Sequence, residues 1–261
     1  MSAFIQGQAL MATESIKPSV LHSNSREGVV IICDHATNFI PEGYDNLGLE
    51  ASTLESHIGW DIGAADVARC MSFMMNVPAI FAPTSRLLID CNRHPDNPSL
   101  VPTISDGVTV PANQQLSQSN IQNRKTAYYD PFHDACAEII SDHVDEGYRP
   151  LVIGLHSFTP IMNGIHRPWQ IGFMWDEDPR LAQAMIGLIK RETDLVVGIN
   201  QPYSGKELYH TMQRHGADHG LPQTVIEIRS DLITEGEGMI RQWAALLADC
   251  LDECMARDDL V

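Results

Sequence analysis

The stretch Val29-Val30-Ile31-Ile32-Cys33-Asp34-His35 decides the fold of this chain. Its first five residues are β-branched or apolar without alternation, which is typical of a strand buried on both faces of a parallel sheet. Two polar residues, Asp34 and His35, follow this strand directly. Because ligands of α/β proteins gather at the carboxyl ends of the strands, His35 is the first candidate for a functional residue.

The alternation of apolar strand and amphipathic helix continues along the chain. Further strands are predicted at residues 78–81, 151–156, 171–175, 195–199 and 224–228, with a weaker candidate at 87–90. Apolar residues at helical spacing predict helices at 61–75, 128–144, 179–192 and 236–255, and a loop followed by a helix at 203–215. Strands that alternate with helices predict an α/β fold, in which a mainly parallel sheet carries helices on both faces.

Two segments lack a clear period. Residues 1–27 are polar and weakly patterned, so we expect them to form a flexible N-terminal arm. Residues 96–118 are rich in Pro, Ser, Asn and Gly, and so long a loop in a compact domain is usually functional or mobile. The chain of 261 residues shows no internal repeat and no linker, which predicts a single domain over residues 28–261.

Composition and charge limit the partners of the chain. Apolar residues make up 44 % and charged residues 20 %, which suits a folded protein with a large core. The formal net charge of −17 repels polyanions, so nucleic acid and anionic membranes are not expected as partners. The sequence shows neither a secretory leader nor an apolar run of bilayer length, and none of its six cysteines forms a CxxC pair. We therefore expect a cytoplasmic protein with reduced thiols.

Chemically active side chains accompany two more of the predicted strands. His156 follows the apolar run 151–155, and Glu227 lies inside the run 224–228. Parallel strands would bring both residues and His35 to one edge of the sheet, and two imidazoles with a carboxylate can hold a catalytic zinc. A lone histidine after a strand is more often a hydrogen-bonded core residue, and a buried Glu227 can pair with an arginine. These alternatives stay open on the sequence alone.

Two arginines and an asparagine stand close together in the segment 85–93. Arg86, Asn92 and Arg93 follow the strand predicted at 78–81. Arginine offers a fork of donors that binds a carboxylate through two parallel hydrogen bonds, and asparagine adds a neutral donor. An N-acyl amino acid carries such a carboxylate, so this segment is a candidate substrate clamp. The alternative is an internal salt bridge from Asp90 to one arginine, which is compatible with substrate binding.

Six short motifs occur in the order of a known family and span about residues 28–235. They are Cys33-Asp34-His35, His57-Ile58-Gly59-Trp60-Asp61-Ile62-Gly63-Ala64, Asp90-Cys91-Asn92-Arg93, Leu155-His156-Ser157-Phe158, Asn200-Gln201-Pro202-Tyr203-Ser204-Gly205 and Ile226-Glu227-Ile228-Arg229. With them the chain resembles the N-formylglutamate amidohydrolase family, which is similar in turn to the zinc carboxypeptidases and aspartoacylase. The resemblance implies a phosphorylase/hydrolase-like three-layer sandwich with a mixed, mainly parallel central sheet.

The resemblance also implies a metal site made of two histidines and a carboxylate. His35 and His156 take the histidine positions, and Zn²⁺ is the expected ion, with another divalent metal as the alternative. The zinc carboxypeptidases place their carboxylate three residues after the first histidine, where this chain has Asn38, a poor ligand. Asp61, at the start of a predicted helix, is therefore assigned this role. Capping of that helix is the structural alternative for Asp61, and His57 is a rival ligand.

The roles of Glu227, Asn92 and Arg93 follow from the same resemblance, and Arg86 and Arg167 are added because guanidinium groups suit an oxyanion and a carboxylate. Glu227 is expected to activate water as a general base and then to protonate the leaving amine, while Arg86 stabilises the oxyanion. Asn92 and Arg93 are expected to bind one substrate carboxylate, and Arg167 a second one.

Two residues and the choice of substrate complete the expected function. Tyr203 and Ser204 lie on a Pro-Tyr-Ser-Gly turn, and they either close over the site or serve the turn alone. The implied activity is hydrolysis of N-formyl-L-glutamate to formate and L-glutamate, a reaction of histidine catabolism, by a monomer or homodimer. The alternatives are an amidohydrolase of another N-acyl amino acid or short peptide, a non-catalytic carboxylate-binding protein, and a purely structural or partner-binding domain.

Overall fold

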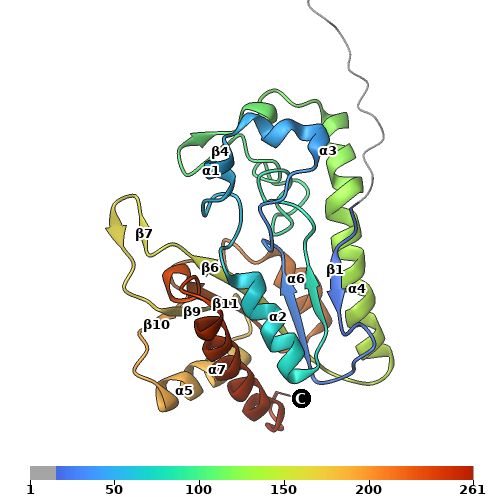
Figure 1. Ribbon diagram of the computed structural model, residues 1–261. Coiled ribbons are helices and arrows are strands. Elements are labelled where there is room, and N and C mark those ends of the chain that lie inside the picture. Colours follow the sequence, from blue (N-terminus) through green and yellow to red (C-terminus); the bar gives the residue numbers. More distant parts are fainter. Residues whose placement is uncertain (1–15, 261) are drawn as a thin grey trace, which may run out of the picture.

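A seven-stranded sheet forms the centre of the computed structural model, which describes residues 16–260 (Figure 1). The strands lie in the order β1-β3-β2-β6-β11-β9-β10. Neighbours are parallel except in the pairs β1–β3 and β11–β9, so the expected mixed, mainly parallel sheet is confirmed. The bounds are β1 Ser19–Leu21, β2 Val29–Cys33, β3 Ala79–Phe81, β6 Leu151–Phe158, β9 Ile171–Met174, β10 Val197–Ile199 and β11 Gln223–Arg229.

Helices cover both faces of the sheet, as in the expected three-layer sandwich (Figure 1). Successive residues of a strand point to opposite faces, so Ile31 packs toward one helical layer and Ile32 toward the other. The first layer contains α2 (Ala64–Met75), α5 (Arg180–Glu192) and α7 (Glu237–Met255), and the second contains α4 (Asp130–Asp145) and α6 (His210–His215). Two shorter helices, α1 (Ala51–Leu54) and α3 (Gln118–Arg124), lie before α4, and a π-helical turn at Lys125–Tyr129 joins α3 to α4.

Three adjacent central strands position the candidate site. In β2 all five residues are buried, as are all eight of β6, which explains the apolar runs at 29–33 and 151–155. Strands β6 and β11 run parallel, in a register that sets Glu227 beside His156. The parallel strand β2 flanks β6 on its other side, so the carboxyl ends of all three strands meet at one edge.

The segment before α2 is held against the end of β2. The backbone N–H of Asp61 donates to the carbonyl of His35 at 3.1 Å. Gly63 has φ +82°, a left-handed conformation that glycine adopts without strain, and a Cβ there would lie 2.9 Å from Cγ1 of Ile233. Helix α2 begins at the next residue. The glycine therefore lets the chain turn sharply, with Asp61 beside His35.

Three expectations from the sequence need correction. The flexible arm was expected over residues 1–27, but residues 19–21 form strand β1. This strand pairs with β3, and its Val20 and Leu21 pack on the core. Residues 1–15 of the expected arm lie outside the described part of the chain. The weak strand candidate at 87–90 is a turn segment whose apolar side chains are buried. The loop at 96–118 contains a small hairpin of β4 (Ile104–Ser105) and β5 (Val108–Thr109). A second hairpin, β7 (Ile161–Met162) with β8 (Ile165–His166), follows β6.

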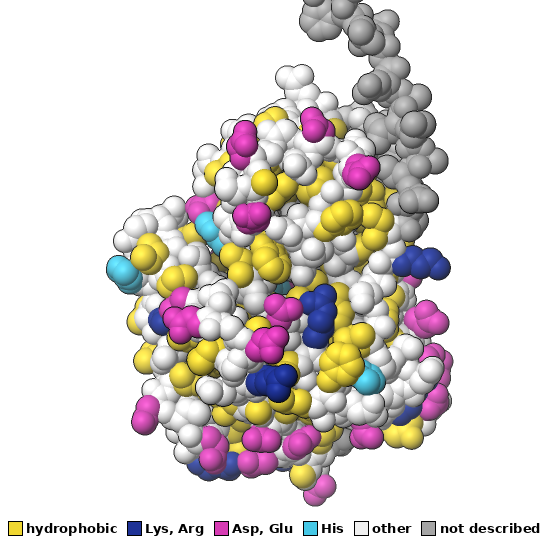
Figure 2. Space-filling view, viewed as in Figure 1, with side chains coloured by type: hydrophobic (Ala, Val, Ile, Leu, Met, Phe, Trp, Pro, Cys, Tyr) yellow, Lys and Arg dark blue, Asp and Glu magenta, His cyan; other side chains and the backbone are white. Residues whose placement is uncertain are grey.

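The surface and the thiols agree with the composition. Acidic side chains are spread over the face drawn in Figure 2, with lysine and arginine side chains sparser among them. The six cysteines are free, and all but Cys70 are buried. Within residues 16–260, no helix has the length and apolarity needed to cross a bilayer.

Candidate active site

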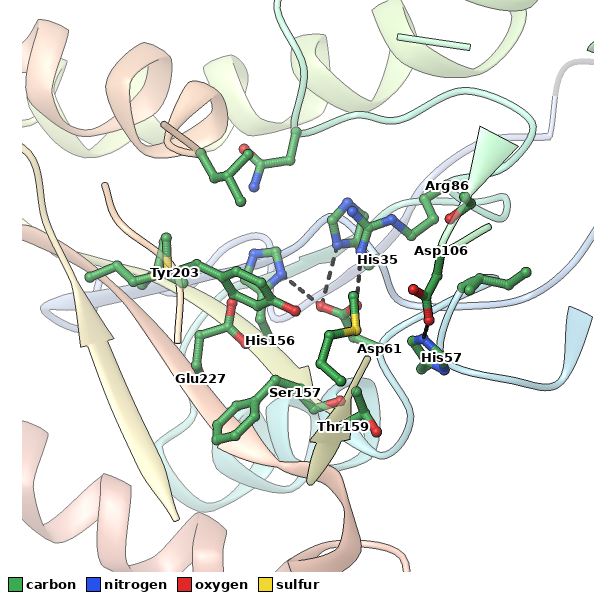
Figure 3. Close-up of a pocket in the computed structure, with 18 of the residues that line it drawn as sticks. His35, His57, Asp61, Arg86, Asp106, His156, Ser157, Thr159, Tyr203 and Glu227 are labelled. Carbon is green, nitrogen blue, oxygen red and sulfur yellow. Dashed lines mark hydrogen bonds and ion pairs between the residues drawn. The ribbon is translucent and has the colours of Figure 1, made fainter. Parts of the chain in front are cut away.

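Four predicted site residues converge at the carboxyl edge of the sheet (Figure 3). His35 follows β2, His156 lies on β6, Glu227 on β11, and Asp61 in the segment before α2. All four are at most 5 % exposed, yet they line a cavity of about 210 Å³. Polar side chains buried together in this way need one another or a ligand, so the edge is a candidate active site.

Asp61 lies between the two imidazoles. Its Oδ2 is 3.3 Å from Nδ1 of His35 and 2.7 Å from Nδ1 of His156 (Figure 3). Helix α2 has Gly63 as its N-cap without a side-chain capping bond, so the Asp61 carboxylate does not cap this helix. The Nδ1 atoms of both imidazoles thus face one carboxylate oxygen, and the three side chains are of the types that bind metal ions.

A different carboxylate lies near the Nε2 atom of each imidazole. Nε2 of His35 is hydrogen-bonded to Oδ1 of Asp90 at 2.9 Å, and Nε2 of His156 lies 3.1 Å from Oδ1 of Asp34 in an ion-pair contact without hydrogen-bond geometry. Carboxylates that bind the far nitrogen of a metal-ligating histidine fix its ring and its tautomer. Asp34 is also placed so that it, His35 and His156 form a buried group that could hold a metal ion.

The acidic surroundings favour a cation between the histidines. Burial lowers the pKa of His156, but Asp34 and Asp61 outweigh it and raise this pKa to about 10. The pKa of His35 is also raised, because the carboxylates of Asp90, Asp61 and Asp34 outweigh burial and the nearby Arg86. The field that makes these imidazoles bind protons would equally attract a metal ion.

Glu227 is a buried acid that forms no ion pair within the described part of the chain. Its Oε2 is buried and has no hydrogen-bond partner among the described residues. Burial raises the pKa of this carboxyl to about 7, against the opposing effect of His156. The expected alternative, pairing with an arginine, is not what residues 16–260 show, since no ion pair to Glu227 is present among them. A carboxyl group with this pKa can both accept and release a proton near neutral pH.

Arg86 closes one side of the cavity. Its Nη1 lies 3.4 Å from Oδ1 of Asp61, and its Nη2 lies 3.3 Å from Oδ2 of Asp90. These carboxylates raise the pKa of the guanidinium against the opposing effect of burial. The internal salt bridge foreseen for Asp90 is therefore present, and Arg86 still lines the cavity.

Asn92 and Arg93 also line the cavity, next to Arg86. The Oδ1 atom of Asn92 accepts a hydrogen bond from the backbone N–H of Thr211 at 3.1 Å. Its Nδ2 group is consequently the end that can donate to a ligand. The side chain of Arg93 is held by a hydrogen bond, in which its Nη1 donates to the carbonyl of Asn92 at 3.0 Å.

The structure does not bring Arg167 or Ser204 into the cavity wall, whereas Tyr203 lines it. Arg167 stacks on the Tyr203 ring at 5.0 Å from the centroid and donates to its hydroxyl at 3.2 Å. Ser204 accepts from the backbone N–H of Lys206 at 3.3 Å, so its hydroxyl serves the turn. Tyr203 therefore separates Arg167 from the reacting groups.

His57 lies near the two-histidine cluster without joining it (Figure 3). Its Nε2 is 3.0 Å from Oδ2 of Asp106, which belongs to the turn of the β4–β5 hairpin. Both residues line the cavity, so the hairpin in the 96–118 segment contributes to its wall. Asp61, rather than His57, is therefore the residue in contact with His35 and His156, while His57 contacts the β4–β5 hairpin.

The sequence assigned no role to Asp34 or Thr211, and for Asp90 it offered only the internal salt bridge. A signal existed for the two aspartates, because each is a charged residue directly after an apolar run and close in sequence to a predicted site residue. Thr211 carries no such signal, since it lies in a polar helix far along the chain. Its contacts with Asp34 and Asn92 exist only in the folded protein.

Comparison with known proteins identifies the family of this arrangement. The profile of the N-formylglutamate amidohydrolases matches residues 27–234. This chain belongs to the N-formylglutamate amidohydrolase family. No curated protein sequence matches it.

Two solved structures are similar to this N-formylglutamate amidohydrolase family member. The gene product Atu2144 from Agrobacterium tumefaciens shares 35 % sequence identity at a TM-score of 0.90, over 95 % of this chain and 98 % of that one. The N-formylglutamate amidohydrolase from Ralstonia eutropha JMP134 has 18 % identity and a TM-score of 0.70, over 93 % of this chain and 99 % of that one. The second likeness supports the α/β fold, and the family match shows that the chain is a hydrolase of amide bonds.

Proposed function

We propose that this protein hydrolyses N-formyl-L-glutamate to formate and L-glutamate with the help of a divalent metal ion, Zn²⁺ being the expected one. The observation that carries the proposal is the position of Asp61, whose carboxylate contacts Nδ1 of both His35 and His156 beside Glu227, which has no ion-pair partner among residues 16–260. This arrangement supplies the ligands, the base and a cavity for a small substrate.

The charges of the site suit a divalent cation. Around the two histidines lie four buried carboxylates, those of Asp34, Asp61, Asp90 and Glu227, and the two guanidinium groups of Arg86 and Arg93. With neutral imidazoles and an ionised Glu227, two negative charges remain uncompensated, which is the charge that one divalent ion neutralises. We propose His35, His156 and Asp61 as its ligands.

The proposed mechanism divides the chemistry between the ion and the side chains. A divalent ion supplies Lewis acidity, which polarises a carbonyl and lowers the pKa of a water molecule. Glu227 accepts the proton of the attacking water and delivers it to the amide nitrogen as the C–N bond breaks. Arg86 donates to the oxygen that becomes negative in the tetrahedral intermediate.

Substrate recognition is proposed to start at the carboxylate of the amino acid. Asn92 and Arg93 bind this group, while Tyr203 forms part of the wall with Arg167 behind it. Because Arg167 lies outside the cavity wall, an N-acyl amino acid with an uncharged side chain is a second candidate substrate. Arg167 can favour an acidic substrate only indirectly, because it reaches the cavity through its hydrogen bond to the hydroxyl of Tyr203.

A substrate panel tests this function. Purified protein with Zn²⁺ restored is assayed with the N-formyl and N-acetyl derivatives of glutamate, glutamine and leucine, and formate or acetate release is measured. We expect the highest kcat/KM for N-formylglutamate and loss of activity after chelation, with recovery on adding Zn²⁺ back. Equal activity before and after complete metal removal would exclude the metal mechanism, and a preference for the leucine derivative would favour the second candidate.

Arg93→Ala tests the substrate clamp. A charge-assisted hydrogen bond to a carboxylate contributes about 1.5–3 kcal/mol, so KM should rise by about 10- to 100-fold with a smaller effect on kcat. Steady-state kinetics on N-formylglutamate measures both constants. Arg241→Ala, an exposed arginine on α7, is the matched control and should leave both unchanged. An unaltered KM in Arg93→Ala contradicts the clamp.

A further inference from the structure

Thr211 is a buried polar residue that the proposed mechanism does not use. It lies on α6, in the helical layer that also contains α4, and only 2 % of its surface is exposed. A buried hydroxyl normally has a partner, because leaving it unpaired costs free energy. The partners of Thr211 lie in the candidate active site.

The hydroxyl of Thr211 donates to Oδ2 of Asp34 at 2.6 Å. The carbonyl of Cys91 is a more distant acceptor at 3.5 Å, so the hydrogen bond to the carboxylate is the stronger one. With Oδ2 engaged in this way, Oδ1 of Asp34 lies 3.1 Å from Nε2 of His156, in an ion-pair contact that lacks the geometry of a hydrogen bond. Thr211 thus acts on the histidine through one intervening carboxylate.

The backbone of Thr211 serves the other half of the site. Its N–H donates to Oδ1 of Asn92 at 3.1 Å, which turns the amide nitrogen of Asn92 into the free donor. Thr211 therefore contacts two parts of the site. Its hydroxyl binds Asp34, which lies beside the proposed metal ligand His156, and its N–H binds Asn92, which is proposed to bind the substrate. The two contacts use different atoms, so a side-chain substitution can remove one and keep the other.

The short helix α6 is fixed at both ends by histidines. His210 lies with Nε2 at 2.6 Å from the hydroxyl of Tyr129, and this hydroxyl donates to the carbonyl of Arg93 at 3.0 Å. At the other end, Nε2 of His215 lies 2.8 Å from Nδ1 of His133.

These histidines are neutral structural groups. Nε2 of His133 contacts the carbonyl of Cys91 at 3.0 Å, so this end of α6 is also tied to the segment that carries Asn92. Burial lowers the pKa of His215 to about 3 and that of His133 well below its usual range, which keeps both uncharged. The position of Thr211 relative to the site is consequently set by packing and hydrogen bonds on both sides.

We propose that Thr211 is a positioning residue for the metal site: its hydroxyl orients Asp34, and Asp34 holds the His156 imidazole with Nδ1 directed at the metal position. The inference rests on the proposed metal-dependent function. A partner in direct contact with a ligand typically changes metal affinity by about 10- to 100-fold when it is removed, and Thr211 lies one step further out, so a smaller effect of about 3- to 10-fold is expected.

Thr211→Val and Thr211→Ser form the test. Valine has nearly the shape of threonine without the hydroxyl and keeps the backbone N–H, while serine keeps both donors. Zn²⁺ affinity of the full chain is measured by competition with a chromophoric chelator, beside KM for N-formylglutamate at saturating Zn²⁺. Thr193→Val, which removes a hydroxyl bound to the carbonyl of Ile189 in α5, is the matched control.

We expect Thr211→Val to bind Zn²⁺ about 3- to 10-fold more weakly with KM unchanged, and Thr211→Ser and Thr193→Val to bind it as the original protein does. Equal Zn²⁺ affinity in Thr211→Val and the original protein would overturn the inference alone. Equal weakening in the valine and serine variants would overturn it too, because the hydroxyl would then not be the cause. Absence of Zn²⁺ binding by the original protein would overturn the proposed function together with the inference.

Discussion

Glu227→Gln is expected to lower kcat by about 100-fold or more while leaving Zn²⁺ affinity unchanged. Glutamine has nearly the same shape and can occupy the same buried position on β11, but its amide does not accept a proton from water. The side chain has no partner among the described residues, so the substitution breaks no ion pair in that part of the chain. Steady-state deformylation kinetics and a metal titration measure the two quantities.

The control for this substitution is Glu235→Gln. Glu235 is exposed, so the same chemical change there should alter neither kcat nor metal affinity. Full activity in Glu227→Gln would remove Glu227 from the reaction. Loss of Zn²⁺ in that variant would instead make Glu227 a ligand, which the proposed arrangement does not allow.

Asp61→Asn should lower Zn²⁺ affinity by at least about 100-fold and abolish turnover at limiting Zn²⁺. Its carboxylate contacts Nδ1 of His35 and of His156, so the substitution removes the one charged oxygen that faces both nitrogens. Asp34→Asn should have a smaller effect, about 10-fold, because the proposed role of Asp34 is to bind the far nitrogen of His156. Chelator competition compares the two variants directly.

This pair of variants also distinguishes two ligand sets. Asp34, His35 and His156 form a buried group that could hold the ion without Asp61. If Asp34→Asn loses the metal and Asp61→Asn retains it, that second set is the correct one. Asp66→Asn, on the exposed side of the first turn of α2, is the matched control and should bind Zn²⁺ normally.

Much of the fold could be predicted because its central strands are buried on both faces. The runs 29–33 and 151–155 lack the alternation of apolar and polar residues that a strand with one exposed face would show. They therefore predicted the central strands and the place where those strands end. Glu227 could be located for a related reason, since a carboxylate in an apolar strand is costly unless it has a function. Short edge elements such as β1 and the β4–β5 hairpin lack this signal, because few of their residues are buried.

The partners of the site residues could not be predicted in the same way. Asp61 was assigned by resemblance, and only the folded chain shows its carboxylate between two imidazoles while His57 interacts with Asp106. The same holds for Arg167, whose guanidinium lies behind the ring of Tyr203. In these loops the direction of a side chain depends on what packs beside it, and strand or helix periodicity carries no such information.

The amino-acid sequence thus specified the sheet, its helical layers and the residue types delivered to its carboxyl edge, because burial imposes a pattern on neighbouring positions. The contact between Asp34 and Thr211 joins residues 177 positions apart and leaves no trace in local pattern. Tertiary packing alone decides which carboxylate faces which nitrogen of His35 and His156, since hydrogen-bond geometry depends on distances that arise only when α6, β2 and β6 are assembled.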